Sequence, residues 1–148
     1  MQIKAMEIDL HLQPVFQNDY LKAEVDEAHH LIYVEWIRHP DSPALREGFL
    51  RLAEIVLESK SRYWLSDAQA IHYIEFADQN WLLSEMAPVL KKSRLAKFAR
   101  LTTPEGMLMM DVARLYDMVR KLTALGITTK LEMFTSREAA LEWLFYDT

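Results

Sequence analysis

Ser66 and Asp67 are the neighbouring polar side chains whose position best suits chemistry. They end residues 62–67, a short aromatic run that is typical of a buried strand, and open α/β sheets bind ligands at the carboxyl ends of such strands. Gln69 follows in the same connection, so these side chains could contact a ligand or a partner. Serine and aspartate in turns also commonly bond nearby backbone amides, and the sequence favours this structural interpretation.

A serine–histidine–aspartate triad could be drawn from Ser66, His72 and Asp78. The glycines of a nucleophile elbow do not surround Ser66, and a triad is defined by a geometry that sequence spacing does not supply. Gly106 and Gly126 are isolated, which excludes the glycine-rich fingerprints of dinucleotide and P-loop sites. We therefore expect no catalytic residue and no enzymatic activity.

The five histidines lack the spacing of a metal site. No His-x-x-x-His pair occurs, and His29 and His30 are adjacent, so in a strand their side chains would point to opposite faces. A zinc site needs three or four convergent ligands. Cysteine is absent, which removes thiolate ligands and a cysteine nucleophile together. We expect neither a metal nor a cofactor.

Met107, Leu108, Met109 and Met110 form an apolar run at the start of a predicted helix. Four consecutive residues cannot all face one stripe of a helix, so part of this surface must be buried elsewhere. Methionine adapts to irregular contacts, which favours filling of the core beneath the preceding loop. A subunit interface and an apolar ligand pocket are the alternatives. The four tryptophans, Trp81 among them, are interpreted as core or interface aromatics.

The composition is that of one globular domain in the cytoplasm. Of the 148 residues, 51% are hydrophobic and 26% are charged, as in ordinary globular proteins. The net charge of −5 argues against sequence-independent binding of nucleic acid, which needs a basic surface. No uncharged apolar run approaches the roughly 20 residues of a transmembrane helix, and charges interrupt residues 1–12, unlike a signal peptide.

Alternating strand and helix patterns predict an α/β fold. The predicted strands cover about residues 20–25, 29–37, 62–67, 95–101 and 128–134, and helices begin near residues 43, 79, 108 and 137. The first two strands form a hairpin, and the later ones need helical crossovers. We expect a mixed, mostly parallel sheet of about five strands with about four helices. Residues 1–19 form an N-terminal arm or an edge strand, and residues 20–148 form a single domain.

Four residues mark the predicted helix boundaries. Ser42, before Pro43, is the expected N-cap of the first helix, and Asp78 is that of the second. Pro88 should bend the second helix or end it early, and Ser136 caps the last. The third helix, over residues 108–124, has a predicted core stripe of Leu108, Val112, Leu115, Val119 and Leu122.

Three segments carry a family resemblance: residues 64–67 (WLSD), 78–81 (DQNW) and 134–144 (FTSREAALEWL). With this element order and length, the chain resembles the STAS domains, the group that includes the anti-sigma-factor antagonists of bacteria. It is most similar to uncharacterised bacterial STAS-like proteins, whose fold is also compared with the lipid-binding CRAL-TRIO domains. The likeness covers roughly residues 20–146.

The resemblance implies a regulatory module, and one position bears on how it would work. In the antagonist branch a phosphorylatable serine follows an aspartate just after the central strand. Asp67 matches that aspartate, but the next residue is Ala68, and Ser66 precedes the aspartate. About ten residues also separate Asp67 from the predicted helix start at Asp78. We therefore expect no phosphoserine switch of the antagonist type.

Two functions remain as expectations from this resemblance. The first is a non-enzymatic module that binds a protein partner and can form a homodimer. Its contacts would centre on Ser66, Asp67, Gln69, Asp78 and Trp81. The second is a carrier of a small apolar or lipid-like ligand, in a cavity lined by Met107, Met110 and nearby aromatic residues.

Overall fold

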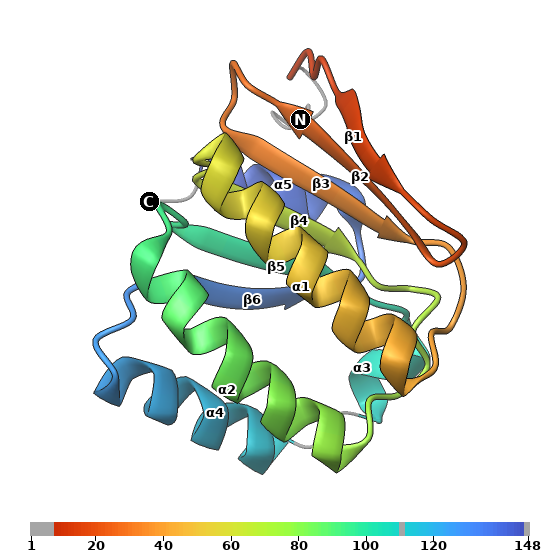
Figure 1. Cartoon of the computed structure of the whole chain (residues 1–148), viewed down its shortest axis with the longest axis vertical. Helices are drawn as coiled ribbons and strands as arrows, with labels where there is room; N and C mark the ends of the chain where they lie inside the picture. The colour runs from red at the N-terminus through yellow and green to blue at the C-terminus, as the bar shows by residue number, and fades with distance from the viewer. Residues whose placement is uncertain (1–7, 110–111, 147–148) are drawn as a thin grey trace.

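One six-stranded sheet organises the chain, whose structure is a computed structural model that describes residues 8–109 and 112–146 (Figure 1). The strands are β1 (Gln13–Gln17), β2 (Leu21–Asp26), β3 (Leu31–Trp36), β4 (Tyr63–Asp67), β5 (Lys97–Leu101) and β6 (Lys130–Phe134). The helices are α1 (Ser42–Ser59), α2 (Phe76–Lys92), α3 (Pro104–Leu108), α4 (Val112–Ala124) and α5 (Arg137–Tyr146).

The strands lie in chain order, and β3 to β6 are parallel while β1 and β2 pair antiparallel. This confirms the predicted α/β class with a mixed, mostly parallel sheet. Within the described residues there are six strands instead of about five and five helices instead of about four. The additional strand is β1, at the edge of the sheet.

Helices cover both faces of the central strands, which explains why β3 is apolar in consecutive positions. Helices α1 and α2 lie on one face, with α4 against α2, and α5 lies on the other face (Figure 1). The first face packs Ile32, Val34, Trp36 and Trp64 against Leu52 and Val56 of α1. The second packs Leu31, Leu65 and Ala99 against Ala140, Leu141 and Leu144 of α5.

The first two helices do not begin where the sequence predicts. Asp41, not Ser42, is the N-cap of α1, because its carboxylate accepts a hydrogen bond from the backbone N–H of Ala44 at 2.9 Å. The Ser42 hydroxyl instead donates to Asp78. Asp78 is not a cap either, since α2 begins at Phe76 and Asp78 is buried in its first turn. The prediction for Ser136 is confirmed, as its hydroxyl accepts from the Ala139 N–H.

Pro88 does not end α2, which continues to Lys92. The proline is exposed, and so is Ser84 one turn earlier. The carbonyl that loses its partner to the proline ring can therefore face water, which makes an interior proline tolerable.

The third predicted helix is wrong at its start. Thr103 caps the separate short helix α3, and Leu108 ends it with a side chain that is 86% exposed. Helix α4 packs on α2 and β6 through a cluster that contains Met118 and Leu122, and Val119 is exposed. The side chain of Val112 lies outside the description.

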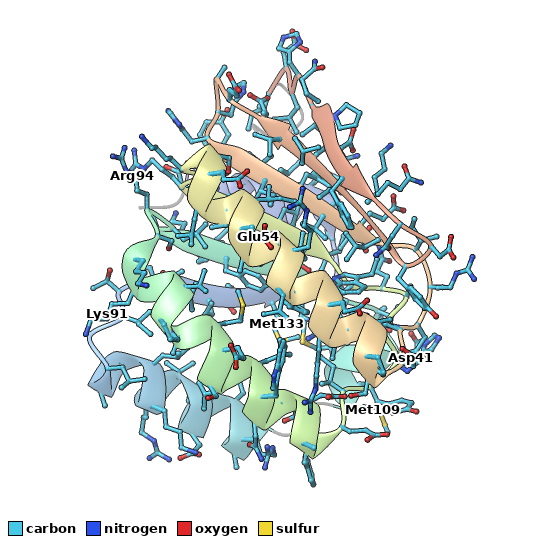
Figure 2. All side chains as sticks on the ribbon, in the orientation of Figure 1. Asp41, Glu54, Lys91, Arg94, Met109 and Met133 are labelled. Atoms are coloured by element: carbon cyan, nitrogen blue, oxygen red, sulfur yellow. The ribbon has the colours of Figure 1, made fainter. Side chains whose placement is uncertain are left out.

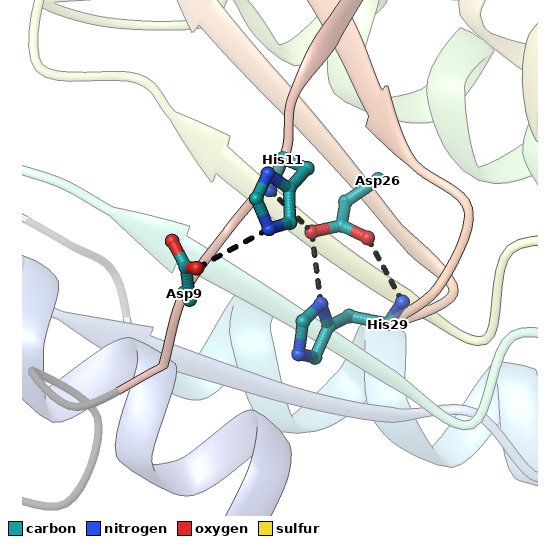
Figure 3. A network of polar contacts seen from close by, with 4 residues as sticks. All are labelled: Asp9, His11, Asp26 and His29. Carbon is teal, nitrogen blue, oxygen red and sulfur yellow. Dashed lines mark hydrogen bonds and ion pairs between the residues drawn. The ribbon is translucent and has the colours of Figure 1, made fainter.

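The β2–β3 hairpin is tied to the segment before β1 through one buried carboxylate (Figure 3). Asp26 accepts hydrogen bonds from the backbone N–H groups of His11 (2.8 Å) and His29 (2.9 Å), and its Oδ2 lies 2.9 Å from Nδ1 of the His29 ring. Burial raises the pKa of Asp26, but these hydrogen bonds outweigh burial and hold the pKa below its usual value. His29 and His30 lie in the turn and not in a strand.

Candidate functional site

The carboxyl ends of β3 to β6 share one edge of the sheet, which is where open α/β sheets place their sites. The first turns of α1, α2 and α3 lie beside this edge (Figure 1). In Figure 2, Asp41 and Met109 mark the carboxyl edge, and Lys91 and Arg94 lie on the opposite side of the molecule. Most of the predicted site residues fall on the carboxyl edge.

The turn after β4 uses its polar side chains to hold its own shape. Oδ1 of Asp67 accepts from the backbone N–H of Gln69 at 3.2 Å and from Nε2 of the same glutamine at 3.0 Å. Ser66 is only 3% exposed, and Ala68, the position of the phosphoacceptor in the antagonist branch, is buried as well. Asp67 and Gln69 thus have the structural role that the turn pattern favours.

Between the β3–α1 and β4–α2 connections lies a cleft of about 360 Å³. It is lined by Tyr20, His39, Pro40, Asp41, Ser42, Leu45, Tyr73, Ile74, Glu75 and Asp78. The lining mixes aromatic, apolar and acidic groups. Met107, the predicted methionine among the described residues, does not line it.

Asp78 joins α1 to α2 at the base of this cleft region. Its Oδ1 accepts from the Ser42 hydroxyl at 2.7 Å and from Nε of Arg46 at 2.9 Å. The hydrogen bond from Ser42 lowers the pKa of Asp78, burial opposes it, and Arg46 lowers it further. The Arg46 guanidinium also lies 5.2 Å from the ring centroid of Trp81. The two predicted contact residues of α2 therefore meet, but around an arginine of the same chain.

Two histidines that the sequence analysis set aside lie together at the cleft. The rings of His39 and His72 stack with centroids 5.4 Å apart, and the Tyr73 ring lies 4.7 Å from that of His39. The backbone N–H of His72 donates to Nδ1 of His39 at 3.1 Å. The two residues are far apart in sequence, and no local pattern could have paired them.

Arg100 is the residue of this edge that sequence reasoning missed. It lies in β5 beside Ser66 of β4 and Met133 of β6. Its Nε atom is buried without a hydrogen-bond partner, and no described residue bonds the rest of its guanidinium. Burial lowers its pKa. A buried donor without a partner costs roughly 1–3 kcal/mol, so Arg100 requires an explanation. The signal was available, since an arginine interrupts an inward-facing strand pattern.

The end of β5 is closely covered by α3. A Cβ atom on Gly106 would lie 2.5 Å from Oγ1 of Thr102, a buried residue, so glycine is what allows α3 to approach. Met107 is half-buried there, whereas Met109 is 84% exposed. Core filling therefore does not account for Met109. Met110 lies outside the described residues.

Large apolar side chains are exposed along the carboxyl edge. Tyr73 (63%) lies between β4 and α2, Phe76 (62%) is the first residue of α2, and Leu108 and Met109 lie at the end of α3. The guanidinium of Arg114 lies 4.2 Å from the Phe76 ring centroid. These residues give the edge an apolar surface, which we call the edge patch: Tyr73, Phe76, Leu108 and Met109.

No group of three histidine, aspartate or glutamate side chains in the described part of the chain could hold a metal ion. None of the described helices is both long and apolar enough to span a bilayer. Comparison with family models, curated proteins and solved structures finds no match to this chain.

Proposed function

We propose that this protein is a non-enzymatic interaction module of STAS type that binds a protein partner through the carboxyl edge of its sheet. The observation that carries this proposal is the edge patch, in which Tyr73, Phe76, Leu108 and Met109 are each more than half exposed. Contiguous apolar surface rimmed by polar residues marks interaction sites. Aromatic side chains also supply much of the binding energy in protein interfaces.

The edge patch favours a partner that offers an apolar segment, because its four exposed side chains are aromatic or aliphatic. Phe76 is also stacked under the Arg114 guanidinium. A phosphoserine switch is not part of the proposal, because Ala68 occupies that position and is buried. A second copy of this chain is one possible partner.

A photo-crosslinking experiment tests the proposal in cells that express the protein. A photoreactive phenylalanine analogue replaces Phe76, Leu108 or, as a matched control, Leu50, an exposed leucine of α1. We expect one protein adduct from positions 76 and 108, lost when Tyr73→Ser and Met109→Ser are added, and none from position 50. Adducts at position 50 alone, or at all three positions equally, would contradict the proposal. An adduct with a second copy identifies a homodimer, which analytical ultracentrifugation checks.

A second candidate function is that of a carrier for a small ligand, favoured by the cleft of about 360 Å³. Ligand pockets commonly measure roughly 300–1,000 Å³. Because Asp41, Glu75 and His39 share the lining with Tyr20 and Tyr73, the ligand would be amphipathic and not purely apolar. Native mass spectrometry of protein purified from cells tests this, and a clean apo mass would count against it.

A further inference from the structure

Two polar side chains lie next to each other on the inner face of the sheet, and one of them has a buried Nε without a hydrogen-bond partner. Ser66 and Arg100 are register neighbours across the parallel pair β4–β5, and such neighbours point to the same face. That face is the one covered by α1 and α2, because Trp64 and Phe98, two residues earlier in each strand, stack there at 5.0 Å.

Nε of Arg100 is buried without a hydrogen-bond partner among the described residues, and the Ser66 side chain beside it is buried. Ser66 is 3% exposed, and Nε of Arg100 has no contact with water. Arg100 as a whole keeps some exposure, so its side chain reaches solvent although its Nε does not. Trp36 and Trp64 also bury unpaired indole N–H groups, but these are neutral and belong to the apolar cluster.

A charged guanidinium with an adjacent hydroxyl is a donor set for an oxyanion. Arginine binds carboxylates and phosphates through two parallel hydrogen bonds, and a serine hydroxyl can donate a third. The carboxyl end of a parallel strand is also where α/β sheets bind ligands. The register neighbours of Arg100 on this face, Ser66 and Met133, are both uncharged.

We propose that Arg100 and Ser66 form a binding site for the carboxylate of a small monocarboxylic acid with an apolar body. One guanidinium neutralises one negative charge, whereas a phosphate dianion would leave a charge uncompensated in a buried place. Phe98 precedes Arg100 on the same face, and Met133 is its neighbour in β6. Figure 2 shows Met133 in the interior, between the ribbons of α1 and α2 in this view. Both side chains suit an aliphatic ligand.

The proposed site is independent of the edge patch and of the cleft. Arg100 and Ser66 do not line the cleft. Neither of them belongs to the edge patch, which consists of exposed apolar side chains. A partner that binds the edge patch could exist without the carboxylate, and the reverse also holds. Crosslinking at position 76 and ligand binding at Arg100 therefore fail or succeed separately.

The test uses sodium octanoate as the probe, with 1-octanol and inorganic phosphate as the other two arms. Binding to the full chain is measured by isothermal titration calorimetry below the micelle concentration. We expect octanoate to bind, octanol and phosphate to bind far more weakly, and Arg100→Met to weaken octanoate binding by about ten-fold or more. Ser66→Ala should weaken it by a smaller factor.

Arg94→Met is the matched control, because Arg94 is exposed just before β5, at the opposite edge (Figure 2). It removes the same charge and should leave octanoate affinity unchanged. Equal losses in the Arg94 and Arg100 variants would overturn the site, as would tighter binding of octanol or of phosphate than of octanoate. If a variant fails to fold, the Nε–H signal of Arg100 in the NMR spectrum of the wild-type protein decides. The signal should shift on addition of octanoate, and an unmoved signal would overturn the proposal.

Discussion

Asp26 and Arg100 are both ionisable side chains with buried polar atoms near strand ends, but they lie at opposite edges of the sheet and differ in their hydrogen-bond partners. Asp26 ends β2, pairs in register with Leu31 at the start of β3, and is fully buried. It accepts two backbone hydrogen bonds and lies 2.9 Å from a histidine ring nitrogen. Arg100, near the carboxyl edge, has a buried Nε with no partner among the described residues.

The difference separates a charge that stabilises the fold from one that the fold tolerates. Burying a charge is costly unless hydrogen bonds compensate. Asp26 has that compensation, and it fastens the segment before β1 to the hairpin (Figure 3). The Nε of Arg100 lacks such compensation among the described residues. Residues that cost stability are retained where activity needs them, which is why the two edges are interpreted differently.

The largest expected effect is the loss of Asp26. Asp26→Asn should reduce the free energy of unfolding by about 3 kcal/mol, because an amide cannot accept from all three donors of this buried site. Urea denaturation measures the change. Asp19→Asn is the control, since Asp19 is exposed, and it should change stability by about 0.5 kcal/mol at most. Equal losses in the two variants would show that Asp26 has no special role.

Asp78 extends the comparison of buried charges. It lies at the carboxyl edge, like Arg100, but it has hydrogen-bond partners, like Asp26. Asp78→Asn should cost about 2 kcal/mol, as the amide weakens the bonds with Ser42 and Arg46. Ser42→Ala should cost about 1 kcal/mol. Both are measured by urea denaturation. If Asp78→Asn left the free energy of unfolding unchanged, the hydrogen bonds of a buried charge would not explain how much that charge stabilises the fold. Its position at one edge of the sheet or the other would then be the better explanation.

Much of the fold could be predicted because its signals are local. The double-sided apolar pattern of β3, the stripe of α1 and the Ser136 cap each depend on residues within a few positions of one another. The prediction of where α1 starts was wrong for a non-local reason. Asp41 and Ser42 are equally good caps by type, and the choice depends on Asp78, far along the chain, to which the Ser42 hydroxyl donates.

In the site, too, contacts between residues close in sequence could be predicted and contacts between distant residues could not. The turn formed by Asp67 and Gln69 could be anticipated, since its hydrogen bonds join residues two positions apart. The neighbourhood of Ser66 and Arg100 could not, because it arises from the register of two parallel strands separated by a helix. The stacking of His39 on His72 arises from two different loops. Sequence patterns can identify each of these residues as a candidate, but they do not predict which of them contact one another.

Arg100→Met should have a smaller effect and the opposite sign. The change removes a buried unpaired donor while the thioether keeps apolar contacts, so we expect the free energy of unfolding to rise by about 1 kcal/mol. Arg46→Met is the control, because Arg46 bonds Asp78 and lies against Trp81, and it should destabilise the protein. A destabilised Arg100→Met variant would mean that Arg100 serves the fold, as Asp26 does.

The smallest expected effect is a loss of stability in acid that comes from Asp26 and not from Arg100. The folded-state pKa of Asp26 lies below its ordinary value of 3.8, so near that pH the unfolded chain binds more protons than the folded one. The stability from Asp26 is therefore fully present well above its ordinary pKa of 3.8 and is lost as the pH falls through that value toward the folded-state pKa. The difference in unfolding free energy between wild type and Asp26→Asn should narrow over that range. The difference between wild type and Arg100→Met should stay constant, because an arginine remains protonated there. Urea denaturation at pH 5 and at successively lower pH compares the two gaps, and a constant Asp26 gap would show that its hydrogen bonds do not favour the charged form.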